Sequence, residues 1–89
     1  MQTKEYQAGD VIYRPGESSD FAFVLKSGAV ELKRGPAGSE KKVAEVKIGD
    51  MFGEYGVIEN DARAEMAVAT AATTVEMLNR DDFAKLYEE

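Results

Sequence analysis

The chain has 89 residues, of which 44% are hydrophobic and 31% are charged. A chain of this size closes one small core, so we expect a single domain over residues 1–89 and exclude a second one. Eleven Lys and Arg residues against seventeen Asp and Glu residues give a formal charge of −6, which disfavours binding to nucleic acid or anionic lipid. The absence of His and Cys excludes most zinc and copper sites, thiol nucleophiles and His-based triads. We therefore predict neither a catalytic residue nor a metal site.

The N-terminal segment bears on the location of the protein. Residues 1–5 are polar where a signal peptide needs an apolar run, and no stretch of roughly eighteen apolar residues occurs in the chain. We therefore expect a cytoplasmic protein that does not enter a membrane.

Short segments with strand character alternate with residues typical of turns. The segments are 11–13, 21–25, 29–33, 42–46, 67–70 and 73–78. Their spacing predicts an all-β sandwich or barrel. Pro15-Gly16 fits a type II turn, since Pro presets φ and Gly accepts the positive φ that follows, so we expect segments 11–14 and 21–26 to pair.

Two segments depart from the strand pattern. Residues 52–59 show no alternation, which predicts one short helical turn that ends at Asn60-Asp61. A second helix is predicted from about residue 80 to the end, because Asn79 is a good N-cap and acidic residues follow in the first turn. One face of this helix carries apolar side chains: Phe83, Leu86 and Tyr87.

A weak internal echo links two parts of the chain. The pattern of an apolar residue, two residues, Gly-Asp and two apolar residues occurs around Gly9-Asp10 and again around Gly49-Asp50. The echo is typical of the two halves of a double-wound β-roll. Gly-Asp is also common in turns generally, so the pair alone leaves both interpretations open.

The segment from Gly49 to Ala64 has the composition of an anion site. If a short helix begins after Gly53, its first N–H groups lack intrahelical partners and point at a ligand, and the Gly residues at 53 and 56 allow a close approach. Arg63 adds a forked guanidinium that matches two phosphate oxygens. The Glu54 carboxylate can accept a hydrogen bond from a sugar hydroxyl. Together these residues predict a pocket for a ribose and one phosphate.

The same residues carry a family resemblance. The order Gly-Asp-x-Phe-Gly-Glu, followed nine residues after Glu54 by Arg63-Ala64, resembles the phosphate-binding cassette of the cyclic nucleotide-binding domain family. This is the β-roll domain of catabolite-activator-type regulators and cyclic-nucleotide-dependent kinases, and the resemblance extends over residues 5 to 87. It implies a mainly β fold: a double-stranded β-helix, or jelly-roll β-roll, with a short helix in the phosphate-binding cassette and a C-terminal helix. Cyclic AMP or cyclic GMP is expected under the short helix.

The resemblance also implies roles for individual residues. Glu54 would bind the ribose 2′-hydroxyl, Arg63 would grip the cyclic phosphate, and backbone groups of Gly53, Gly56 and Ala64 would contact the ligand. Tyr55 lies within this predicted ligand-binding set, although apolar packing or a surface position also accounts for it. Relatives that prefer cyclic GMP often carry a hydroxyl after the Arg, and Ala64 has none, which favours cyclic AMP.

Two features depart from the family pattern. The position of Glu65 is usually small, and if a strand runs from Arg63 the two side chains share one face. We then expect Glu65 to pair with Arg63 and block the ligand, so that Glu65→Ala raises affinity about tenfold or more. The family also continues into a longer helix that covers the base, and since this chain ends at Glu89 we expect only modest affinity.

Three functional hypotheses follow. The leading one is a non-catalytic sensor module that prefers cyclic AMP and acts on an effector domain or protein partner. The alternative is a degenerate β-roll that serves as an interaction or structural module and no longer binds nucleotide, because Glu65 occupies Arg63. A cupin-like metal enzyme on a similar jelly roll needs a His-rich metal site, which a chain without His cannot supply.

Overall fold

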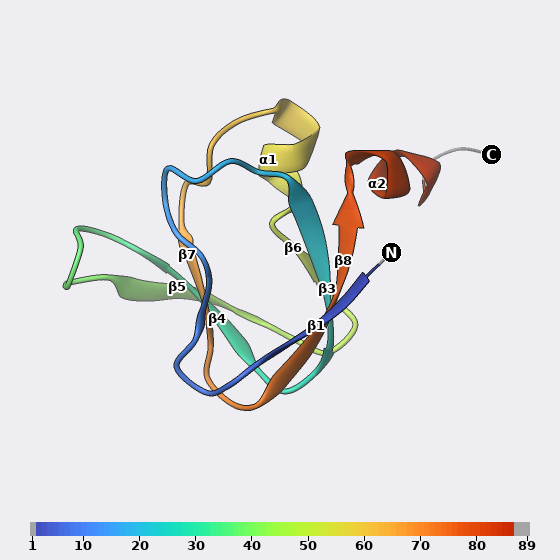
Figure 1. Cartoon of the computed structure of the whole chain (residues 1–89). Coiled ribbons are helices and arrows are strands. Elements are labelled where there is room, and N and C mark those ends of the chain that lie inside the picture. The colour runs from blue at the N-terminus through green and yellow to red at the C-terminus, as the bar shows by residue number, and fades with distance from the viewer. Residues whose placement is uncertain (1, 87–89) are drawn as a thin grey trace.

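The computed structural model describes residues 2–86, which form two four-stranded antiparallel sheets and two short helices. In chain order the elements are β1 (Gln2–Tyr6), β2 (Val11–Tyr13), β3 (Phe21–Ser27), β4 (Val30–Arg34), β5 (Lys41–Val46), β6 (Met51–Phe52), α1 (Glu54–Glu59), β7 (Met66–Ala69), β8 (Thr73–Asn79) and α2 (Arg80–Leu86). One sheet has the strand order β1-β8-β3-β6 and the other β2-β7-β4-β5. Figure 1 shows both helices at the same end of the roll, away from the projecting β4–β5 hairpin. The predicted β-roll with a short internal helix and a C-terminal helix is confirmed.

The pairing of β2 differs from the prediction. β2 does not pair with β3; it pairs with β7 in the other sheet. The type II turn does form, with Gly16 at φ 88° and a hydrogen bond of 3.2 Å from the Glu17 N–H to the Arg14 carbonyl. The backbone of this turn also bonds to the backbone of Arg63. The Gly16 N–H donates to the Arg63 carbonyl at 2.9 Å, and the Arg63 N–H donates to the Glu17 carbonyl at 2.8 Å. These bonds tie the loop after β2 to the segment that precedes β7, and the chain then crosses to the other sheet, where β3 lies.

Two strands lie outside the predicted set. β1 is an edge strand with exposed residues, and it pairs along its whole length with β8. β6 has only two residues and pairs with β3. Neither has a core-facing alternation long enough to mark it as a strand in the sequence.

The two Gly-Asp turns of the internal echo have the same geometry. Gly9 and Gly49 adopt φ values of 92° and 94°. In each turn the Asp side chain accepts a hydrogen bond from the backbone N–H three residues earlier, at 2.7 and 3.2 Å. The Gly N–H then donates to a strand, Ala69 of β7 in one case (2.7 Å) and Leu25 of β3 in the other (2.8 Å). The echo therefore marks equivalent turns, one against each sheet.

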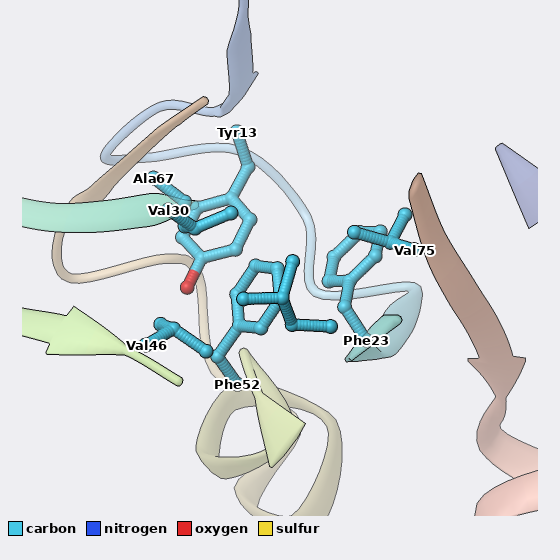
Figure 2. Packing of buried hydrophobic residues seen from close by; sticks show 8 residues of the cluster. Tyr13, Phe23, Val30, Val46, Phe52, Ala67 and Val75 are labelled. Atoms are coloured by element: carbon cyan, nitrogen blue, oxygen red, sulfur yellow. The ribbon is translucent and has the colours of Figure 1, made fainter. Parts of the chain in front are cut away.

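The core lies between the sheets and is rich in aromatic rings. Figure 2 shows Tyr13, Phe23 and Phe52 packed together among aliphatic side chains of both sheets. The ring centroids of Phe23 and Phe52 lie 5.2 Å apart, and those of Tyr13 and Phe23 5.9 Å apart. A second cluster, around Val57, Leu78 and Phe83, holds both helices against β3 and β8.

Over the described residues the second helix begins at Arg80, as predicted, whereas α1 begins at Glu54 and not at Phe52, which belongs to β6. α1 ends at Asn60, which adopts the left-handed conformation. Asn79 caps α2 by accepting a hydrogen bond of 2.7 Å from the Asp82 N–H. Tyr87, predicted on the apolar face of the second helix, lies outside the described residues. Within residues 2–86 no helix has the length and apolar character needed to cross a bilayer.

Candidate functional site

A pocket of about 400 Å³ opens beside the N-terminal end of α1. It is bordered by the segments 50–56 and 61–65 and by residues of β2, β4 and β5. All seven residues singled out from the sequence line it: Gly53, Glu54, Tyr55, Gly56, Arg63, Ala64 and Glu65. Its volume lies in the range that small-molecule sites have in proteins.

Arg63 is the buried cation of this pocket. The residue is only 7% exposed, although charged side chains are rarely buried without a partner. Its Nη1 donates to the Gly53 carbonyl at 2.6 Å and its Nη2 donates to the Phe21 carbonyl at 2.5 Å. Its Nε is buried and has no hydrogen-bond partner. Burial lowers the pKa of Arg63 from its usual value, with charge interactions opposing that shift.

Aromatic rings complete the surroundings of the guanidinium. The Arg63 Cζ lies 4.1 Å from the ring centroid of Tyr13 and 5.7 Å from that of Phe23. Both distances fall within the range of cation–π attraction. Desolvation by burial raises the pKa of Tyr13 to about 12, so its phenol is neutral at ordinary pH.

Gly53 makes room for this guanidinium. It adopts φ 75°, a left-handed conformation that favours glycine, at the position that precedes α1. A Cβ at Gly53 would lie 2.8 Å from Arg63 Nη1 and 3.1 Å from the Tyr13 ring. No side chain caps the helix start. Since α1 has six residues, we assign the charge of the site to Arg63 rather than to the helix dipole.

Gly56 and Tyr55 occupy different environments. Gly56 is buried, and a Cβ there would collide with the Ser19 side chain, so the small residue is needed for packing of the loop after β2. Ser19 also donates a hydrogen bond of 2.6 Å to the Asp61 carbonyl. Tyr55 is 67% exposed and lies at the pocket rim.

Glu65 pairs with Arg34 and not with Arg63. Its carboxylate, just before β7, accepts a hydrogen bond of 3.0 Å from Nε of Arg34 at the end of β4. The expected pairing with Arg63 required a strand that begins at residue 63. The chain reaches strand geometry only at Met66, so the alternation that would place residues 63 and 65 on one face does not apply. The structure therefore corrects the expected Arg63–Glu65 pair.

Three contributors to the site were missing from the prediction. Tyr13 and Arg34 line the pocket, and the Phe21 carbonyl holds Arg63 from 42 residues away in the sequence. Tyr13 and Phe21 had been identified only as members of strands. A backbone carbonyl has no sequence signal, since every residue carries one.

Carboxylates outnumber guanidinium groups in the pocket lining, which includes Glu45, Asp50, Glu54, Asp61 and Glu65 beside Arg34 and Arg63. Among residues 2–86 no group of acidic side chains is arranged to hold a metal ion. A second, more polar hollow of about 590 Å³ lies by the C-terminal end of α1, where Arg80 Nη2 donates to Asn60 Oδ1 at 3.1 Å. It contains neither Arg63 nor Glu54.

Known proteins resemble this chain over almost its whole length. A family model described as the cyclic nucleotide-binding domain matches residues 3–89. A cAMP-dependent protein kinase regulatory subunit of Blastocladiella emersonii is 32% identical over 87 residues, which are 97% of this chain and 22% of that protein. A cGMP-dependent protein kinase of Caenorhabditis briggsae is 36% identical over 90 residues, covering 97% of this chain and 12% of the kinase. The chain therefore spans less than a quarter of each of these relatives.

A solved structure shares the fold. The regulatory domain of Toxoplasma gondii PKA, crystallised with cAMP, superimposes with a TM-score of 0.87 at 29% identity. The match covers 96% of this chain and 33% of that structure.

Proposed function

Because this chain belongs to the cyclic nucleotide-binding domain family, we propose that the pocket beside α1 binds a cyclic nucleotide, with Arg63 as the phosphate ligand. The observation that carries the proposal is the unpartnered Nε of Arg63. A buried donor without an acceptor is unfavourable by about 1–3 kcal/mol, and more for a charged group. A phosphate oxygen supplies the missing acceptor and the opposite charge together.

The other contacts follow from the places of the predicted residues. Glu54 is half-buried at the start of α1 and lines the pocket, where its carboxylate can accept a hydrogen bond from the ribose 2′-hydroxyl. Backbone groups of Gly53, Gly56 and Ala64 line the same space. Tyr55 at the rim is placed to cover part of the ligand rather than to bind its phosphate.

We propose a preference for cyclic AMP over cyclic GMP. Ala64 follows Arg63 in the pocket lining and has no hydroxyl that could bond to the guanine amino group. The C. briggsae relative is by name a cGMP-dependent kinase, so relatedness alone does not decide the base. Ala64→Thr is expected to raise cyclic GMP affinity relative to cyclic AMP.

We further propose that this domain senses and does not catalyse. The described pocket contains no His, Cys or metal cluster, and its residues are suited to holding a charged ligand. An effector, carried elsewhere in the same protein or by a partner, would respond to occupancy. A single domain over residues 1–89 and a cytoplasmic location remain predictions.

The second candidate is a β-roll that has lost nucleotide binding. The observation in its favour is the excess of carboxylates in the pocket lining, which repels an anionic ligand. This candidate was first suggested by an expected ion pair between Glu65 and Arg63. That pair does not form in the structure, because Glu65 pairs with Arg34.

Calorimetric titration separates the two candidates. We expect saturable 1:1 binding of cyclic AMP and weaker binding of cyclic GMP. Absence of measurable heat and of thermal stabilisation with either nucleotide at millimolar concentration would favour the degenerate β-roll.

A further inference from the structure

Tyr13 contacts Arg63 more closely than any other ring in the described structure. It lies at the end of β2, is 5% exposed, and places its ring centroid 4.1 Å from the guanidinium carbon. The ring itself is held by Phe23 and Phe52, at centroid distances of 5.9 and 6.4 Å (Figure 2). A well-packed ring of this kind provides a fixed platform for a cation.

The contacts that hold Arg63 are electrically neutral. Two backbone carbonyls accept from Nη1 and Nη2, and the rings of Tyr13 and Phe23 lie against the guanidinium. Asp20 and Glu17 favour the charged form of Arg63, but the side-chain hydrogen bonds described for Arg63 go to backbone carbonyls. A bonded carboxylate would cancel the positive charge, whereas carbonyl dipoles and an aromatic quadrupole stabilise it and leave it available to an anion.

These contacts together fix the orientation of the side chain. The carbonyls of Gly53 and Phe21 hold the two terminal nitrogens, and the Tyr13 ring limits rotation out of the guanidinium plane. Gly53 adds to the fit, because a Cβ there would lie too close to Arg63 Nη1, at 2.8 Å, and in tight contact with the Tyr13 ring, at 3.1 Å. The Nε–H is the one guanidinium donor atom left buried without an acceptor.

We propose that Tyr13 is a positioning residue for anion binding, whose ring holds the Arg63 guanidinium in the orientation in which its Nε–H has no protein acceptor and remains for the ligand phosphate. The proposal rests on the proposed function of the pocket. Tyr13 acts through Arg63, and its neutral phenol preserves the positive charge of the site. Tyr13 rather than Phe23 has this role because its ring lies closer to the guanidinium, at 4.1 against 5.7 Å.

The binding test compares Tyr13→Leu, which removes the ring, with Tyr13→Phe, which keeps it. We expect Tyr13→Leu to weaken cyclic AMP binding about tenfold, the effect of losing a desolvated cation–π contact. Tyr13→Phe should stay within about twofold of the wild type, because the ring and its packing are retained. Calorimetric titration measures both variants.

Val75→Ala is the matched control. Val75 of β8 is fully buried in the same core cluster, but it is not among the residues that line the pocket and has no described contact with the Arg63 guanidinium. Val75→Ala should lower thermal stability and leave cyclic AMP affinity near that of the wild type. Equal losses of affinity in Tyr13→Leu and Val75→Ala, or wild-type affinity in Tyr13→Leu, would overturn the positioning role.

A measurement without ligand separates this inference from the proposed function. In the free protein, the ring current of Tyr13 should shift the Arg63 Nε–H proton resonance upfield, and Tyr13→Phe should preserve that shift. Tyr13→Leu should abolish it. If the wild type binds neither cyclic nucleotide, the proposed function fails; an unshifted Arg63 resonance in the wild type shows instead that the stacking itself is absent.

Discussion

Arg63 and Arg34 line the same pocket but occupy opposite environments. Arg63 is buried, bonds to two carbonyls and stacks on Tyr13. The Arg34 side chain is 61% exposed and forms an ion pair with Glu65. The Arg63 guanidinium is thus surrounded by neutral groups, whereas the charge of Arg34 is balanced by the Glu65 carboxylate in a pair that water can reach.

The difference shows that a count of charges does not identify an anion site. An exposed ion pair contributes about 0–1 kcal/mol and leaves little net field, while a cation desolvated among dipoles interacts strongly with an anion that enters. This contrast is the reason for proposing Arg63, and not Arg34, as the cation that binds the ligand. Arg34 is paired with the carboxylate of Glu65.

The largest expected effect comes from removing each cation in turn. Arg63→Ala should weaken cyclic AMP binding by about 2–5 kcal/mol, the usual loss when one partner of a desolvated charge pair is removed. Arg34→Ala should weaken it by less than about 1 kcal/mol, as expected for a partner in an exposed pair. Titration of both variants measures the contrast, and equal losses would show that burial does not distinguish the two residues.

High pH should lower the stability of the folded protein through ionisation of the buried Tyr13 phenol beside Arg63. Folding raises the pKa of Tyr13 from 10.0 to about 12, so between these values the folded state retains a proton that the unfolded state has lost. Stability is therefore full below about pH 10 and falls as pH rises to about 12, by about 2–3 kcal/mol from this group. Urea unfolding of the wild type and Tyr13→Phe isolates the contribution, because other groups titrate in both. A stability difference that does not change with pH would contradict it.

Adding a methyl group at Gly53 should disturb Arg63 specifically. Gly53→Ala introduces a Cβ close to Arg63 Nη1 at a positive φ, so we expect about 1–2 kcal/mol of lost stability and weaker cyclic AMP binding. Gly49→Ala is the control: φ is 94° there and no atom lies within 4 Å of the new Cβ. It should lose similar stability through strain and keep its affinity. Affinity losses of the same size in both variants would mean that the Gly53–Arg63 contact has no special role.

The smallest effects are expected in the Arg34–Glu65 pair. Arg34→Ala leaves Glu65 without its partner and should reduce cyclic AMP affinity about two- to fivefold. Glu65→Ala alone should raise affinity less than about threefold, well below the tenfold gain that pairing with Arg63 would have implied. The double variant should return close to the wild type. A tenfold or larger gain in Glu65→Ala would restore Glu65 as the residue that blocks the ligand.

The parts of the site that the sequence predicted are those that depend on local order. The Gly-Asp turns, the short helix over 54–59 and the Asn79 cap each rest on residues a few positions apart. The family resemblance added the fold and the association of Arg63 with the start of α1. These elements place every predicted residue around one pocket.

The parts that were missed depend on contacts between distant segments. β2 was paired with its neighbour in sequence, but the backbone around Arg63 takes up the hydrogen bonds of the intervening loop. The Glu65 error came from extending β7 by three residues toward Arg63, because strand alternation was then applied to residues that precede the strand. The Phe21 carbonyl and the Tyr13 ring meet Arg63 only after both sheets have closed.

A crystal structure of the chain with cyclic AMP tests the central claim most directly. The account predicts that an oxygen of the cyclic phosphate lies about 2.7–2.9 Å from Arg63 Nε, with the guanidinium still stacked on Tyr13 and Glu65 still paired with Arg34. A phosphate bound to Arg34, or a nucleotide in the pocket with Arg63 Nε still unpartnered, would contradict it.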